Sequence, residues 1–295
     1  MRQLRLTRWV NGLLIGAKVL LRRIQKMPSD REKVESLIST GGEIAGTATG
    51  GAIGFLAGGP AGAAVGGALG VIISKGAIRL LSDIADRFLS KREKIRVGAT
   101  AAFALAKIKS HLDAGFKARN DGFFDDKEGK RSDAEEIFEG VLLKAKNEHE
   151  EKKAKILGNI FANIAFLQGF SVGEANHLLQ IAQNLTYRGM CILSLIKRKN
   201  QIQDVKLRED SYRESKGERI FYETISILQE AYQIYNSGLI ACKQKSSEGY
   251  EALLGWTDVA PNRSLLTPMG ERYYEVMGLE DILEEDIKAV AKYLS

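Results

Sequence analysis

A glycine stands at every fourth position from residue 42 to residue 70, and no other stretch of the chain is so regular. The positions are Gly42, Gly46, Gly50, Gly54, Gly58, Gly62, Gly66 and Gly70. Each interior glycine costs a water-exposed helix roughly 0.5–1 kcal/mol relative to alanine, so this density needs compensation. Close backbone approach supplies it, because small residues four apart let helices pack without large side chains between them. The repeat therefore predicts tightly packed helices.

The same stretch carries no charge. Residues 44–74 form a run of 31 positions without an ionisable side chain. One helix of that length would span about 46 Å, more than the roughly 30 Å hydrocarbon core of a bilayer. Pro60 interrupts it, and a period of four drifts by about 40° per repeat around a helix. We therefore predict a hairpin of two helices, residues 44–57 and 61–74, packed through their glycine faces.

This pattern resembles the glycine zipper of membrane-inserting and pore-forming proteins. The resemblance implies that residues 36–75 form a hydrophobic hairpin that self-associates in lipid. Each arm is about 21 Å long, which suits shallow insertion or an oligomer better than two simple spans. A buried glycine-rich hairpin in a soluble protein and a flexible linker are the alternatives, although flexible linkers rarely keep strict spacing.

Basic charge accompanies the glycine stretch. Residues 1–99 contain 16 Lys and Arg against 7 Asp and Glu, whereas the remainder contains 27 against 30. Residues 1–35 are predicted to contain a basic amphipathic helix lying on anionic phospholipid. Its candidate membrane-surface residues are Trp9, Arg5, Arg8, Arg22 and Arg23. A mitochondrial presequence and a solvated helix packed on the folded domain are the alternatives; Lys18 disfavours a secretory signal.

Helical patterns continue after the glycine stretch. Residues 76–120 predict amphipathic helices: a helix at 76–96 continues as an alanine-rich helix at 97–116, and a polar loop follows at 120–131. A capping box of Ser132 and Glu135 predicts the start of one long helix, whose charged run at residues 146–155 is interpreted as a solvated face. A second capping box at residues 171–174 predicts a short helix, and residues 132–184 are therefore assigned as a helical linker region.

The region 185–279 resembles a winged helix-turn-helix domain. Residues 185–196 resemble its first helix, residues 225–240 its third helix, and the Leu-Thr-Pro-Met-Gly-Glu-Arg sequence at 266–272 the ending after the wing. The resemblance implies a small β wing, and residues 246–263 are expected to contain this wing or a long loop. Residues 280–295 predict an acidic terminal helix.

The charge of this region disfavours DNA binding. Neutralising phosphates needs Lys and Arg, but residues 185–279 contain 13 basic and 12 acidic side chains. The predicted helix at 221–236 has no Lys or Arg. We therefore interpret the region as a degenerate winged helix that binds a protein partner or oligomerises, with nucleic acid as the alternative. Tyr222, Tyr232 and Tyr235 are candidate partner anchors, and core packing is the alternative for them.

The sequence predicts no catalytic residue, no cofactor and no metal site. The three histidines stand in no HExxH spacing, and the glycine stretch lacks the GxxxxGK[ST] phosphate loop. Cys191 and Cys242 are isolated, which is typical of a protein in a reducing cytosol. Enzymatic activity is therefore not expected.

Together these patterns predict a mainly α protein: a glycine-zipper hairpin with amphipathic flanking helices, a helical region and a winged-helix-like domain. The architecture resembles toxic effectors of bacterial defence modules and other pore-forming toxins. The resemblance implies a cytoplasmic protein, peripheral or inserted at the inner membrane, whose partners are anionic lipid, further copies of itself and a regulatory protein. A membrane-tethered DNA-binding regulator and a scaffold that does not permeabilise the membrane are the alternatives.

Overall fold

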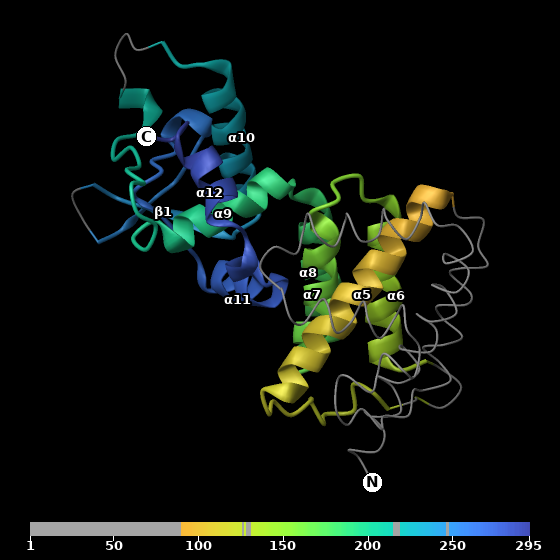
Figure 1. Cartoon of the computed structure of the whole chain (residues 1–295). Helices are drawn as coiled ribbons and strands as arrows, with labels where there is room; N and C mark the ends of the chain where they lie inside the picture. The colour runs from red at the N-terminus through yellow and green to blue at the C-terminus, as the bar shows by residue number, and fades with distance from the viewer. Residues whose placement is uncertain (1–89, 126, 128–130, 215–218, 246–247) are drawn as a thin grey trace. The chain divides into compact units, whose positions relative to one another are not determined.

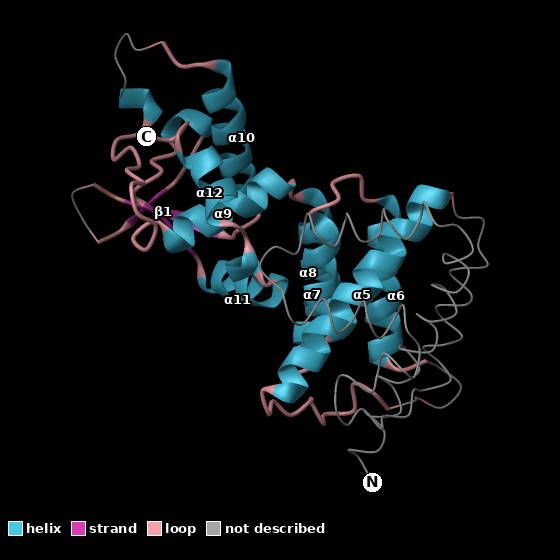
Figure 2. Ribbon diagram, viewed as in Figure 1, coloured by secondary structure: helices cyan, strands magenta, loops and turns pink. Residues whose placement is uncertain are grey.

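The computed structural model describes residues 90–125, 127, 131–214, 219–245 and 248–295 (Figure 1). Contacts within the chain divide it into two units, residues 1–183 and 184–295. The described residues are mainly helical, with one three-stranded antiparallel sheet near the C-terminus, which confirms the predicted mainly α class (Figure 2). The glycine register at 42–70, the basic residues at 5–23 and the helix predicted before residue 90 lie outside the described residues.

Helix α5 (Lys91–Asp113) is the first described element of unit 1. Its N-cap is Ser90, whose hydroxyl accepts the N–H of Glu93, while the Glu93 carboxylate accepts the N–H of Ser90. This reciprocal capping box fixes the start of the helix. A continuous helix from residue 76 to residue 116 is therefore wrong, because a helix starts at Lys91 and ends at Asp113, whereas its alanine-rich part does continue from residue 96 without a break.

Three further helices complete the described part of this unit: α6 (Asp133–Asn147), α7 (Lys153–Ile164) and α8 (Val172–Asn184). Two of them start where the capping signals predict. The hydroxyl of Ser132 accepts the N–H of Glu135 at 3.2 Å, and that of Ser171 accepts the N–H of Glu174 at 3.1 Å. Each bond satisfies one of the backbone donors that a helix start leaves unpaired.

The expected single long helix from residue 132 is wrong. Helix α6 ends at Asn147 and α7 begins at Lys153, because Glu148 turns the chain and its carboxylate accepts the N–H groups of His149 and Glu150 at 2.8 and 3.0 Å. The charged run is not a solvated face throughout either. The side chains of Glu148 and Lys153 are 7% and 2% exposed, and they form an ion pair at 2.5 Å.

Helices α5 and α7 approach each other closely at Gly158. A Cβ atom at this residue would lie 2.7 Å from the carbonyl oxygen of Thr100 and 2.8 Å from the backbone N of Ala104. Such contacts leave no room for a side chain, so glycine is required by packing. The rings of Phe138 and Phe161, 4.8 Å apart, extend the core between α6 and α7.

Unit 2 combines four helices with the sheet. The helices are α9 (Tyr187–Arg198), α10 (Tyr222–Asn236), α11 (Pro268–Met277) and α12 (Glu284–Ala291). The strands β1 (Ile240–Lys243), β2 (Tyr250–Glu251) and β3 (Ser264–Leu266) form an antiparallel sheet in the order β2-β1-β3. The Tyr187 hydroxyl donates to Asp286 at 2.8 Å and ties α9 to α12.

Two boundaries in unit 2 differ from the expectation. The hairpin joins β1 to β2 and therefore begins before residue 246, where the wing was placed. The terminal helix does not start at residue 280, because Gly278 adopts a left-handed conformation with φ 65° and ends α11. A short 3₁₀ turn, Leu279–Asp281, follows before α12.

The Thr-Pro-x-Gly sequence at residues 267–270 has a local physical explanation. Thr267 is the N-cap of α11 and its hydroxyl accepts the N–H of Gly270 at 3.0 Å. Pro268 occupies the first turn, where its missing N–H costs nothing. Gly270 faces Leu239, whose carbonyl oxygen would lie 1.9 Å from a Cβ atom at this position.

Candidate functional site

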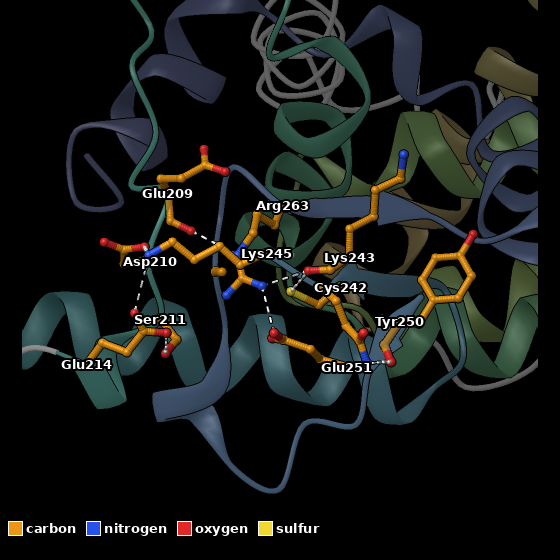
Figure 3. Close-up of polar contacts among 12 residues, drawn as sticks. Glu209, Asp210, Ser211, Glu214, Cys242, Lys243, Lys245, Tyr250, Glu251 and Arg263 are labelled. Atoms are coloured by element: carbon orange, nitrogen blue, oxygen red, sulfur yellow. Dashed lines mark hydrogen bonds and ion pairs between the residues drawn. The ribbon is translucent and has the colours of Figure 1, made fainter. Parts of the chain in front are cut away.

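Polar side chains gather where the β1–β2 hairpin meets the segment before α10 (Figure 3). We call this group the hairpin cluster and define it by its members Glu209, Asp210, Ser211, Glu214, Lys243, Lys245, Glu251 and Arg263. No local pattern in the sequence identifies any of them as a site residue. They come from three segments that only the fold brings together.

Arg263 is the centre of the hairpin cluster. Its side chain is 5% exposed. One terminal nitrogen, Nη1, donates to the carbonyl oxygen of Lys243 at 2.7 Å and to the carboxylate of Glu251 at 2.8 Å. Its Nε donates to the carbonyl oxygen of Glu209 at 3.1 Å. A planar guanidinium is suited to such divergent acceptors, so Arg263 joins both hairpin strands to the preceding segment.

Lys245, in the loop that joins β1 to β2, is held by acidic residues. Its Nζ lies 2.6 Å from Asp210 and 3.7 Å from Glu214. The hydrogen bond to Lys245 lowers the pKa of Asp210, and the same bond raises the pKa of Lys245. The pair is solvent-exposed, so it orients the hairpin more than it stabilises the fold.

The Cys242 thiol lies beside this cluster and is fully buried. Burial raises the pKa of this thiol above its usual value, so it stays protonated near neutral pH. Because the thiolate is the nucleophilic form, the geometry does not suit a reactive cysteine. The contacts of the hairpin cluster therefore hold the β1–β2 hairpin to the segment before α10, and Cys242 beside it is a buried, protonated thiol.

Arg263→Lys is expected to lower the free energy of unfolding of unit 2 by about 2 kcal/mol. Lysine keeps the charge but cannot reach three divergent acceptors, which leaves buried carbonyl groups without donors. Urea denaturation followed by circular dichroism measures the change. The exposed Arg219→Lys variant is the control, and an equal stability of the two variants would contradict the central role of Arg263.

The three candidate tyrosines of α10 lie in different environments. Tyr222 is 81% exposed at the start of the helix, and its neighbour Phe221 is 67% exposed. Tyr232 and Tyr235 are half-buried, with stacked rings 6.2 Å apart. The Tyr235 hydroxyl accepts the N–H of Leu253 at 3.3 Å, so it holds the chain after β2. The structure therefore places Tyr222 as a free surface residue and gives Tyr235 a structural contact.

Two further large apolar side chains are exposed, one in the hairpin and one after it, and no local sequence pattern identifies them. Tyr250 in β2 is 61% exposed and Leu254, just after it, is 77% exposed. The Tyr250 ring points away from the hairpin cluster (Figure 3). Exposed large apolar side chains of this kind are typical of binding surfaces when they gather in patches.

Most described Lys and Arg side chains of unit 2 have partners within the unit. The ion pairs are Arg188–Glu230, Lys197–Glu271, Arg213–Asp258, Lys245–Asp210, Arg263–Glu251 and Lys288–Glu284. In addition, Lys199 donates to the carbonyl oxygen of Ser264 at 2.7 Å. Little unpaired positive charge is left for a phosphate backbone.

The described part of unit 1 contains one group with the donor types of a metal site. The donor atoms of Glu148, His149 and Glu150 lie within 4.8 Å of one another. However, Glu148 already accepts two backbone N–H groups and pairs with the ammonium of Lys153, which takes the place of a cation. The donor set therefore does not favour a metal ion.

Within the described residues no helix is both long and apolar enough to cross a bilayer. Comparison of this chain with models of protein families, with curated proteins and with solved structures finds no match.

Proposed function

We propose that this chain binds anionic membrane lipid, self-assembles and permeabilises the bacterial inner membrane from the cytoplasmic side. The observation that carries the proposal is the glycine register at residues 42–70, which falls within a 31-residue charge-free run. Small residues at this spacing favour helix association in lipid. The basic excess of residues 1–99, 16 against 7 acidic side chains, favours anionic phospholipid as the first contact.

We propose that unit 2 is a winged-helix-like module that binds a regulatory protein. Its order of α9, α10, a β hairpin and a Thr-Pro-x-Gly helix start supports this assignment. The internal pairing of its basic side chains supports a protein partner over DNA, because phosphate binding depends on available Lys and Arg. Phe221 and Tyr222 supply exposed aromatic surface, the residue type that is enriched in protein interfaces.

Dye release from anionic vesicles tests the membrane proposal. The full-length double variant Gly54→Leu, Gly62→Leu should release dye at least about tenfold less efficiently than the native chain, because two bulky side chains separate the packed backbones. The matched control is Gly51→Leu, Gly67→Leu, which adds the same apolar bulk outside the four-residue register. This control should retain release.

Equal release by the two double variants would contradict a role for the glycine register. Vesicle binding by the native chain without release would instead indicate a scaffold that anchors a partner. If the native chain neither binds vesicles nor releases dye, a glycine-packed soluble fold remains and the DNA-binding regulator is favoured. Salt-sensitive binding to duplex DNA would then identify that function.

A further inference from the structure

The β2 side of the small sheet is open. The strand order β2-β1-β3 leaves β2 (Tyr250–Glu251) and β3 (Ser264–Leu266) at its two edges. The β3 edge is covered, since Ser264 and Leu266 are 1% and 6% exposed. Within the described residues no strand pairs with the outer side of β2. An edge strand carries backbone donors and acceptors with which a further strand can pair.

Exposed apolar side chains alternate along residues 250–254, which we call the β2 edge. Tyr250 and Leu254 are 61% and 77% exposed, and Ala252, midway between them, is exposed as well. Side chains two residues apart in an extended strand point to the same face. The β2 edge therefore presents one row of apolar side chains without a charge. The lysine or proline that edge strands often use against pairing is absent from these five residues.

Two other residues hold the β2 edge in its extended shape. Glu251 turns to the opposite face, where its carboxylate accepts a hydrogen bond from Arg263 at 2.8 Å (Figure 3). Leu253 is buried, and its N–H donates to the hydroxyl of Tyr235 at 3.3 Å. Because these contacts lie within one chain, the β2 edge is ordered before it meets a partner. Such preorganisation lowers the entropic cost of binding.

The β1–β2 pairing shows which backbone groups face the open side. The carbonyl oxygen of Gly249 accepts the N–H of Gln244 at 2.9 Å, so the backbone groups of Gly249 face β1. Those of successive residues point to opposite sides of a strand. The groups of Glu251 therefore also face β1, and those of Ala252 face the open side. Ala252 thus offers both a donor and an acceptor to a further strand.

We propose that the β2 edge pairs antiparallel with the β2 edge of a second copy, about a two-fold axis at Ala252. The inference rests on the proposed self-assembly and gives it a contact within unit 2. The row is complementary to itself when reversed, because Tyr250 then lies against Leu254 of the second copy. Ala252 meets its counterpart, and their N–H and C=O groups exchange two hydrogen bonds.

The distribution of charge favours an identical copy as the occupant. Two-fold pairing of a charged row would bring like charges together, and the uncharged row avoids this repulsion. The cation on the neighbouring strand, Lys243, lies opposite Tyr250 and is exposed. Three strand spacings would separate the two copies of Lys243, about 14 Å, which exceeds the roughly 8 Å screening length at physiological ionic strength.

The contact is small. Five residues from each copy fall well short of the roughly 20–30 residues a side of a standard interface. Pairing alone is therefore expected to be weak in dilute solution. A second contact between the same chains raises their effective concentration, so the β2 edge would join copies that the membrane has already gathered.

Disulfide formation between full-length chains tests this register. In Ala252→Cys the two thiols meet at the axis with Cα atoms about 5.5 Å apart, so mild oxidation should give a reducible homodimer. Tyr250→Cys, on the same face, is the control and should form at least about tenfold less, because its two copies would lie about 14 Å apart. Mixing Tyr250→Cys with Leu254→Cys should restore the bridge. Cys191 and Cys242 are buried and do not compete.

Dye release gives a second readout. Ala252→Lys brings two ammonium groups together at the axis and should raise the protein concentration for half-maximal release by about threefold to fivefold. Its control is Ala289→Lys, at an exposed position of α12. Equal values for the two lysine variants would overturn a role of the β2 edge in assembly.

The two readouts separate this contact from the proposed function. Absence of an Ala252→Cys dimer above the Tyr250→Cys control would overturn pairing between copies and leave the β2 edge to a strand of another protein. A specific dimer in a chain that never releases dye would keep the contact and refute permeabilisation. Release without the dimer would refute the contact and keep permeabilisation.

Discussion

Gly270→Ala is expected to destabilise unit 2 by more than about 3 kcal/mol. The new Cβ atom would lie 1.9 Å from the carbonyl oxygen of Leu239 and 2.9 Å from its carbonyl carbon. Both are backbone atoms and cannot rotate away. The same oxygen accepts the N–H of Thr267 at 3.0 Å. A shift of α11 that relieves the clash would therefore also break this hydrogen bond between Thr267 and Leu239.

Chemical denaturation followed by tryptophan fluorescence and circular dichroism measures this loss. Gly255→Ala is the matched control, because nothing lies within 4 Å of a Cβ atom there and its φ of −172° is extended backbone. The control should change stability by less than about 0.5 kcal/mol. Similar unfolding midpoints for the two alanine variants would show that α11 does not depend on contact at Gly270.

Lys153→Ala is the second substitution with a large expected effect, a loss of about 3–5 kcal/mol from unit 1. The Nζ of Lys153 lies 2.5 Å from Glu148 and donates to the carbonyl oxygen of Gln183 at 3.2 Å. Removing the ammonium leaves a buried carboxylate without its counter-ion. The exposed Lys117→Ala variant serves as the control for loss of a lysine charge in the same unit.

A double variant separates the pair from its packing. Lys153→Met with Glu148→Leu removes both charges and should recover a large part of the stability, since apolar replacement of a complete buried pair is often neutral. If the double variant were as unstable as Lys153→Ala, the loss would come from the shape of the side chains. Thermal unfolding of all four proteins at one pH provides the comparison.

The same pair makes acid stability depend on Glu148. Burial alone would raise the pKa of this carboxyl, but the hydrogen bond and charge of Lys153 and the N–H groups of Glu150 and His149 lower it below its usual 4.5. The ionised Glu148 therefore contributes to the free energy of unfolding above pH 4.5, and this contribution is lost as the pH falls through the lowered pKa. Glu148→Gln should flatten the dependence of stability on pH below 4.5.

Local signals predicted part of this fold correctly. Ser132 and Ser171 start helices because capping depends on residues only three positions away. The break at Glu148 could not be predicted in this way. The carboxylate of Glu148 pairs with the buried Lys153, whose ammonium also donates to the carbonyl oxygen of Gln183 in α8, 30 residues further along the chain. Tertiary contacts, which no local pattern contains, decide that outcome.

The candidate site shows the same limit. Aromatic residues at helical spacing identified Tyr222, Tyr232 and Tyr235, but the spacing does not reveal which one faces solvent. Arg263 could not be predicted as a centre because its acceptors lie 12, 20 and 54 residues away in the chain. Phe221 was detectable in principle, as the apolar residue next to Tyr222 at a helix start.

Chemical modification of the buried amine of Lys153 can report whether the helices of unit 1 are packed or separated. An acylating reagent modifies accessible lysines, whereas this amine, 2% exposed and bound on two sides, reacts only in molecules whose helices have separated. Mass spectrometry of one peptide then gives the open fraction directly. The readout works in suspensions of vesicles, where light scattering obscures optical signals of unfolding, and so measures whether adding lipid changes the open fraction.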